Sequence, residues 1–206
     1  NRRFASFNPQ ESFVAQDRNP QAEQMGDESM VRNLAFQADA IWPQEKSLFD
    51  RYRLTGELRI LDVGCGTGEI TRRLAQLYPQ AHVIGNDILE SNLALARRDS
   101  RELAGRVEYQ HGDAFAMTFP DASFDLIVCR HMSQAVPDFP LVLAEFTRVL
   151  KPGGWLHLLS EDYGMIHMPV GDFDPDRFWN AHAVAFLHSI GCDERVGRHS
   201  PMLLEK

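Results

Sequence analysis

The chain has 206 residues, 44% of them apolar and 24% charged, a composition typical of a soluble globular domain with a sizeable core. Its formal net charge of −8 and pI near 5.4 argue against a nucleic-acid partner, because nucleic-acid-binding proteins usually present a basic face. No apolar run approaches the about 18 residues of a membrane span, so we expect no membrane partner.

The cysteines and the first residue bear on the compartment and the limits of the chain. Cys65, Cys129 and Cys192 show no CxxC spacing, which favours a reducing compartment and, by default, the cytoplasm. No charged-then-apolar signal peptide opens the chain. Because the chain begins with Asn1 rather than Met, we expect the natural N-terminus to lie upstream.

Residues 1–56 are interpreted as an N-terminal arm and a helical lid. Residues 1–28 are polar and interrupted by Pro9 and Pro20, which predicts an irregular arm with one short helix. Beyond them, apolar periodicity predicts an amphipathic helix over 30–42. Pro43 either breaks this helix or starts a second one, and Thr55-Gly56 ends the helical segment.

Residues 57–160 alternate between short apolar strands and helices. The expected strands are 59–63, 82–87, 107–110, 124–130 and 155–160. The expected helices are 69–78, 90–100 and 140–150. Continuous apolar strands separated by helices are typical of a parallel sheet covered on both faces. We therefore predict a doubly wound, mostly parallel α/β domain.

Residues 161–206 lack this alternation and are interpreted as a lid loop and helix of the same domain. Glycine and proline residues predict a loop over 161–174, and Pro175 after a capping Asp174 predicts a helix to Ile190. The segment is rich in aromatic and Met side chains: Tyr163, Met165, Met168, Phe173, Phe178, Trp179 and Phe186. They either line an adaptable apolar pocket or pack ordinarily between helix and sheet.

The strongest signal is the stretch Ile60-Leu61-Asp62-Val63-Gly64-Cys65-Gly66-Thr67-Gly68, where a buried strand leads through three alternating glycines into a helix. Such glycines let the backbone turn sharply and let a ligand approach it, and the following helix offers N–H donors. Ligands of open α/β sheets bind beyond the carboxyl ends of the strands, where this loop falls. A tight strand-to-helix connection that binds no ligand would have the same glycines. The loop alone is therefore weak evidence for a ligand site.

Asp87 ends the next strand, about 20 residues after the loop, where a carboxylate can bind both ribose hydroxyls. An aspartate there can also merely cap the next helix; beside the glycine loop, ribose binding is the favoured interpretation. The GxGxG spacing differs from the GxGxxG of dinucleotide-binding folds, and no Lys-Ser/Thr follows as in a P-loop. An NAD-binding oxidoreductase is therefore disfavoured.

Residues 57–160 resemble the core of class I S-adenosylmethionine (SAM)-dependent methyltransferases. The matching landmarks occur in order at 60–68, 85–88, 111–114, 124–131 and 150–154. The resemblance implies that the loop surrounds the methionine part of SAM through Asp62, Gly64, Cys65, Gly66 and Gly68. It implies that Asp87, followed by Ile88, binds the ribose. It also implies that Asp113 bonds the adenine amino group and that the N–H of Ala114 reaches the ring.

The fourth expected strand departs from one branch of this family. It ends in Cys129-Arg130-His131-Met132 rather than in the Asn/Asp-Pro-Pro-aromatic motif of enzymes that methylate adenine, cytosine or glutamine amino groups. In this it is similar to the small-molecule branch, which includes ubiquinone-biosynthesis-type methyltransferases. The family's sheet normally closes with two further strands, the last antiparallel, and we expect C-terminal strands that this chain does not contain.

Methyl transfer requires a nucleophile held in line at about 3–3.5 Å from the methyl carbon, and in some cases a base. His131 follows the fourth strand near the expected sulfonium and is the candidate base; a packing histidine is the alternative. Arg130 is expected to contact the cofactor through its backbone or to support the pocket wall. Arg32, in the N-terminal helix, either reaches the SAM carboxylate or lies on the surface.

Glu161, Asp162 and His167 follow the fifth strand and either orient the acceptor or belong to a solvated loop. Their spacing is not typical of a metal site, so we expect no metal. The favoured function is methyl transfer from SAM, with S-adenosylhomocysteine (SAH) as product, to an O, N or C atom of a small apolar or aromatic metabolite. A monomer or homodimer is expected. A protein or tRNA methyltransferase, or a SAM-binding module without catalysis, is the alternative.

Overall fold

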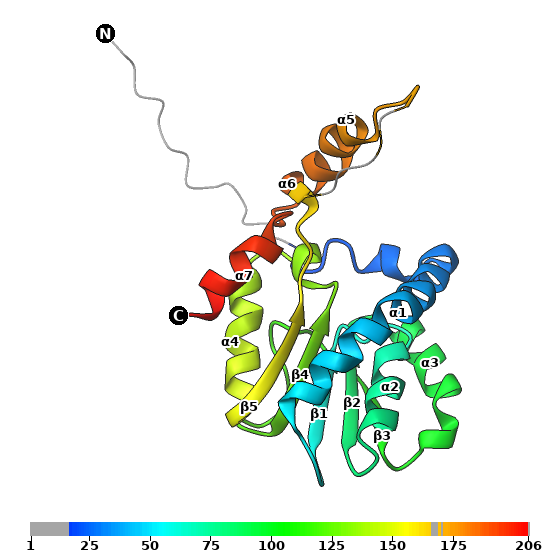
Figure 1. The fold of residues 1–206 in the computed structure, drawn as a ribbon, viewed down its shortest axis with the longest axis vertical. Coiled ribbons are helices and arrows are strands. Elements are labelled where there is room, and N and C mark those ends of the chain that lie inside the picture. The colour runs from blue at the N-terminus through cyan, green and yellow to red at the C-terminus, as the bar shows by residue number, and fades with distance from the viewer. Residues whose placement is uncertain (1–16, 166–168, 170, 206) are drawn as a thin grey trace, which may run out of the picture.

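A sheet of five parallel strands forms the centre of the computed structural model, which describes residues 17–165, 169 and 171–205. The strands lie in the order β3-β2-β1-β4-β5 (Figure 1). Their bounds are β1 Arg59–Val63, β2 His82–Asp87, β3 Val107–His111, β4 Phe124–Arg130 and β5 Leu150–Leu159. The strand order reverses at β1 and β4, which confirms the predicted doubly wound α/β fold.

Helices cover both faces of this sheet (Figure 1). On one face, α1 (Glu28–Phe49) and α2 (Glu69–Leu77) pack over Ile60 of β1 and Leu126 of β4. Next to them, α3 (Glu90–Asp99) lies against β3 and β2. On the other face, α4 (Phe139–Val149) packs against β1 and β4. Short 3-10 helices complete the connections: η1 Glu23–Gly26, η2 Asp50–Tyr52, η3 Arg101–Leu103, η4 Ser133–Ala135 and η5 Tyr163–Met165.

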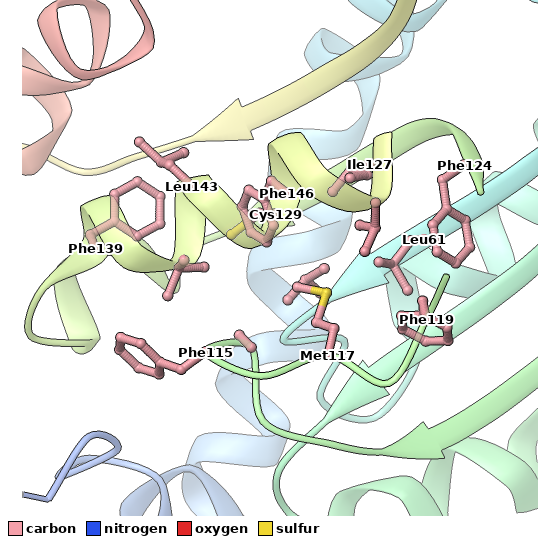
Figure 2. Packing of buried hydrophobic residues seen from close by; sticks show 14 of the residues in the cluster. Leu61, Phe115, Met117, Phe119, Phe124, Ile127, Cys129, Phe139, Leu143 and Phe146 are labelled. Atoms are coloured by element: carbon pink, nitrogen blue, oxygen red, sulfur yellow. The ribbon is translucent and has the colours of Figure 1, made fainter. Parts of the chain in front are cut away.

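The larger core cluster lies between α4 and the sheet. Figure 2 shows Phe139, Leu143 and Phe146 of α4 facing Leu61 and Ile127 of the two central strands. Because helices cover both faces, Ile60 is as fully buried as Leu61, although the two side chains point to opposite faces of the sheet. Burial on both faces explains why these strands are continuously apolar.

Pro43 lies inside α1, and the predicted helix break is wrong. A proline inside a helix removes one backbone hydrogen bond and costs about 3 kcal/mol. The part of α1 after Pro43 is held in the core, where Glu45 and Phe49 are 3% and 1% exposed. Phe49 also stacks on His157 of β5, with ring centroids 4.2 Å apart. This tertiary packing offsets the missing bond.

The start of β5 also differs from the prediction. The strand begins at Leu150 rather than at the expected residue 155, so the landmark at 150–154 lies within it. Phe124 of β4 pairs with Leu150, whereas Leu126 pairs with Trp155, and the intervening residues form a bulge. The other predicted strands and helices of the core agree with the structure to within one residue at each end.

The C-terminal part contains more helix than the sequence pattern predicts. The expected helix consists of α5 (Pro175–Trp179), a π-helical turn η6 (Asn180–Val184) and α6 (Ala185–Ser189), which project away from the sheet (Figure 1). A further helix, α7 (Val196–Leu204), lies against η4, and its apolar pattern is interrupted by Gly197 and Pro201.

Some predictions lie outside the described residues: the first part of the N-terminal arm, over residues 1–16, and the candidates His167 and Met168. Among the helices that the structure does describe, none combines the length and apolar character needed to cross a membrane.

Candidate active site

A cleft opens at the carboxyl ends of β1, β2 and β4, beside α1 and η1, with a volume of about 1090 Å³ including its open mouth. Most of the predicted cofactor residues line it: Asp62, Gly64, Cys65, Gly66, Asp87, Ile88, Ala114 and Arg130. The candidate base His131 lines it as well. The cleft therefore gathers residues from four separate sequence landmarks at the edge of the sheet where ligands of this fold class bind.

The glycine loop is tied to the end of β2 by its own backbone. The N–H groups of Gly64 and Cys65 donate to the carbonyl of Asn86 at 2.8 and 3.1 Å. The N–H of Gly66 donates to Oδ2 of Asp87 at 2.8 Å. These bonds fix the loop beside Asp87, so the two features that the sequence suggested separately form one wall of the cleft.

Asp87 does not cap α3, because the N-cap of this helix is Leu89 and no side chain caps it. Oδ1 of Asp87 accepts the N–H of Leu89 at 2.9 Å, and its role in ribose binding stays a prediction. Each carboxylate oxygen can accept a second hydrogen bond, so capacity for a ligand hydroxyl is left. Burial raises the pKa of Asp87, and the backbone hydrogen bonds to the carboxylate offset only part of that effect.

Asp62 lies at the floor of the cleft and is 2% exposed. Its Oδ2 accepts a hydrogen bond from the hydroxyl of Thr71 in α2 at 2.6 Å. Burial raises the pKa of Asp62 to about 6, because desolvation disfavours the charged carboxylate.

The backbone N–H, the backbone carbonyl and the ring Nδ1 of His131 each contact another residue. Its φ is +54°, in the left-handed region, and its N–H donates to the carbonyl of Leu159 at 3.0 Å. Its own carbonyl accepts from Nε2 of Gln134 at 2.8 Å. Its Nδ1 lies 2.7 Å from Oε1 of Glu161. The remaining ring nitrogen, Nε2, is shielded from solvent and has no hydrogen-bond partner among the described residues.

A family model for a methyltransferase domain matches residues 61–158, which contain the glycine loop, Asp87 and His131. Residues 61–158 are therefore similar to this domain family.

Several similar proteins are methyltransferases. A demethylmenaquinone methyltransferase of Deinococcus radiodurans is 39% identical over 102 residues, which cover 50% of this chain and 42% of the relative. One from Thermus thermophilus is 35% identical over 129 residues, covering 63% and 58%. The chain spans about half the length of these curated relatives. Phosphoethanolamine N-methyltransferase 2 of Haemonchus contortus, solved in complex with SAM, gives a TM-score of 0.58 at 25% identity, over 68% of this chain and 34% of that one.

Three predicted cofactor residues do not line the cleft: Arg32, Gly68 and Asp113. Arg32 lies on the exposed face of α1 and pairs with Glu28 at 2.8 Å. The carboxylate of Asp113 accepts the N–H of Phe115 at 3.0 Å, within the turn after β3. Their roles in SAM binding stay predictions.

Gly68 is needed for the packing of the glycine loop against β3. Its φ is +77°, and a Cβ built on it would lie 2.8 Å from Cζ of Tyr109 on β3, where no side chain fits. The third glycine of the loop is thus explained by helix-to-sheet packing, without a ligand.

A buried polar network connects α1 to β4 and β5 and is not foreseen from the sequence. Nε of Arg130 donates to Oε1 of Glu45 at 2.7 Å, and the same oxygen lies 3.2 Å from Nε2 of His157. Nδ1 of His157 is 2.9 Å from the hydroxyl of Tyr52. Burial alone would raise the pKa of Glu45, but the hydrogen bonds from His157 and Arg130 outweigh it and lower that pKa. Arg130 thus supports the pocket wall, one of its two expected roles.

Asn92 is a second cleft residue that the sequence does not reveal. It lies on α3, is 2% exposed, and lines the cleft beside Asp87. Its Nδ2 donates to the carbonyl of Met25 at 3.3 Å, which holds η1 over the rim of the cleft. Its Oδ1 has no hydrogen-bond partner in the described part of the chain. A polar residue on a predicted surface helix carries no sequence signal of such a position.

The remaining candidates, Glu161 and Asp162, lie in the loop after β5 and contact different parts of the protein. Asp162 pairs with Arg198 of α7, with Nη2 to Oδ1 at 3.0 Å, whereas Glu161 contacts His131. No cluster of three or more His, Cys, Asp or Glu side chains that could hold a metal occurs within residues 17–165, 169 and 171–205.

Proposed function

We propose that this chain is a SAM-dependent methyltransferase that transfers a methyl group to an O, N or C atom of a small metabolite and releases SAH. The observation that carries the proposal is the cleft in which the glycine loop, Asp87 and His131 meet. The identity of 35–39% to demethylmenaquinone methyltransferases makes a quinone-type aromatic acceptor the first class to test. No nucleic-acid partner is proposed, in keeping with the net charge of −8.

The residues of the cleft fit the cofactor. Because Gly64 and Gly66 have no side chains, the methionine part of SAM can approach the main chain of the loop. Asp87 also lines the cleft, and its carboxylate can accept hydrogen bonds from the ribose hydroxyls. Ala114 lines the same cleft, and its N–H is the proposed donor to the adenine ring. When bound, SAM supplies a methyl group on a positively charged sulfonium, which is intrinsically electrophilic.

The protein's part is to position the acceptor and to accept its proton. His131 is the proposed base, because it lines the cleft at the end of β4 and its Nε2 has no other partner among the described residues. Met132, Ala135 and Val136 follow it along the cleft wall and offer an apolar surface for an aromatic ring. The sparse, unpaired cysteines support a cytoplasmic location.

Calorimetric titration tests the cofactor half of the proposal. SAM and SAH should bind, and NAD should not. Asp87→Ala should weaken SAH binding by about 10- to 100-fold, the usual effect of losing hydrogen bonds to a charged group. Asp121→Ala, which removes an exposed carboxylate just before β4 at the far end from the cleft, is the matched control and should bind as the wild type does. Absence of SAM binding, or equal binding by both variants, contradicts the proposal.

The acceptor is tested with reduced naphthoquinones and benzoquinones that lack one ring methyl group, read by the mass gained when a methyl replaces a hydrogen. Methylation of these compounds, and not of bulk tRNA or protein substrates, is the expected result. Labelling of tRNA or protein instead would favour the macromolecular alternative. SAM binding without methylation of any of the three classes would favour the binding module.

A further inference from the structure

Glu161 lies outside the matched region 61–158, in the loop after β5. Both its backbone and its side chain are held by hydrogen bonds. Its backbone carbonyl accepts the N–H of Gly197 in α7 at 3.0 Å. A Cβ on Gly197 would lie 2.8 Å from the carbonyl carbon of Glu161, so only glycine permits this approach. The helix that the sequence did not predict therefore clamps this one position of the loop.

The side chain of Glu161 is also fixed at both oxygens. Oε1 lies 2.7 Å from Nδ1 of His131, and Oε2 accepts the hydroxyl proton of Tyr163 at 2.8 Å. Burial would raise the pKa of Glu161, but the hydrogen bonds from His131 and Tyr163 lower it below the usual value. An ionised carboxylate can only accept hydrogen bonds, so the contact requires a proton on Nδ1 of His131.

Tyr163 links this pair to the projecting helices. Its ring packs edge-on against Trp179 of α5, with centroids 5.3 Å apart. The phenol donates to Glu161 and is itself largely buried, so burial raises the pKa of Tyr163 and keeps it protonated as a donor. The carboxylate thus receives one hydrogen bond from the lid side and one from the cleft side.

We propose that Glu161 is the positioning residue of this site, which holds His131 in the Nδ1–H tautomer so that Nε2 presents its lone pair to the methyl acceptor. This inference rests on the proposed methyltransferase function. The acceptor's O–H, N–H or acidic C–H proton passes to Nε2, and its electron pair forms the new bond to the methyl carbon. The bond from that carbon to sulfur breaks with its electrons remaining on sulfur, and the imidazolium later releases its proton to water.

One consequence concerns access. Because Nε2 is shielded from solvent in this arrangement, the acceptor reaches it only after a local movement of the cleft wall. Glu161 keeps the imidazole oriented during that movement, since its contacts lie on the Nδ1 side of the ring and away from the acceptor.

The tautomer can be measured without any acceptor. In the full chain labelled with ¹⁵N-histidine, long-range proton–nitrogen correlation spectra at pH about 8 should show His131 as the Nδ1–H tautomer, assigned by loss of its signals in His131→Ala. Glu161→Gln should reduce the share of this tautomer. Glu108→Gln, which removes another carboxylate that contacts a histidine on the exposed edge of the sheet, should leave the His131 signals unchanged. An Nε2–H tautomer in the wild type would overturn the inference.

Turnover with an accepted substrate provides the second test. Glu161→Gln should lower kcat by about 10- to 100-fold, part of the effect of a general base, with SAH affinity within about twofold of the wild type. Adding Glu161→Gln to His131→Ala should cause no further loss, because the residue acts through His131. An equal loss in both backgrounds would refute the positioning role.

If Glu161→Gln fails to fold, Tyr163→Phe is a milder variant that removes only the hydrogen bond to Oε2 of Glu161. It should lower kcat by a few-fold, and an unchanged kcat would count against the positioning role of Glu161. If SAM fails to bind, the proposed function fails, while the tautomer measurement still decides the role of Glu161.

Discussion

The carboxylate of Glu45 on α1 and the guanidinium of Arg130 on β4 form an ion pair inside the protein, with side chains only 4% and 8% exposed and Nη2 2.6 Å from Oε2. The two residues are separated by 85 positions in the chain. His157 of β5 contacts the same carboxylate, so one acidic side chain joins the N-terminal helix to two strands. The stability of the domain should therefore depend strongly on this single contact.

Glu45→Leu should destabilise the fold by about 3–5 kcal/mol, because it leaves the buried charge of Arg130 unpaired. Urea-induced unfolding measures this loss. The control is Glu28→Gln, which breaks the exposed pair with Arg32 on the same helix and should cost at most about 1 kcal/mol. Equal effects of the two variants would show that burial does not determine the strength of the contact.

The same pair should make stability depend on acidic pH. Because the folded-state pKa of Glu45 is lowered, its contribution is fully present above its unfolded value of 4.5 and is lost as the pH falls through the folded value. The difference in unfolding free energy between the wild type and Glu45→Leu should therefore shrink below pH 4.5. A difference that stays constant down to pH about 3 would contradict the assigned charge state.

Asp62 should show the opposite dependence. Its folded-state pKa of about 6 lies above the ordinary 3.8, so the contribution of Asp62 to stability is fully present below pH 3.8 and is lost as the pH rises through about 6. Asp62→Asn removes this charge. Between pH 4 and 8 the variant should gain up to about 3 kcal/mol relative to the wild type, which denaturant unfolding at both pH values can measure. A pH-independent difference would mean that the carboxylate is ionised throughout.

Gly68→Ala should destabilise the fold through a steric clash with Tyr109. Gly56→Ala is the matched control, because Gly56 has a similar φ of +86° but nothing within 4 Å of its added Cβ. The control should cost about 1–2 kcal/mol for the left-handed backbone alone. Gly68→Ala should cost a further about 1–3 kcal/mol for overpacking, measured by thermal or urea unfolding. Similar losses for both would show that Tyr109 moves aside.

The sequence predicts the sheet and the cofactor wall well for a physical reason. Strands buried on both faces must be continuously apolar, and a turn between strand and helix demands glycine, so β1, β2 and β4 and their loops leave a local signal. Asp87 is recognisable because its distance from the loop follows from the βαβ geometry.

The remaining features depend on partners that are distant in sequence. Nothing in the sequence around Glu45 indicates its burial, which is explained by the positions of Arg130 and His157 in space. The break expected at Pro43 is absent because tertiary packing offsets a local penalty. Glu161 could be predicted as polar and near the site, but its contact with His131 depends on α7, whose sequence does not resemble a helix.

Pro43 divides α1 into two sections with different surroundings. Leu34, Gln37 and Ala38, before the proline, line the cleft, and Ala38 is also buried in the core. Glu45 and Phe49, after the proline, are buried and do not line the cleft. A helix bends most easily where a backbone hydrogen bond is missing. Pro43 is therefore the position at which a bend of α1 would move residues of the cleft wall relative to Glu45 and Phe49. Pro43→Ala would restore the missing backbone donor and make such a bend less favourable.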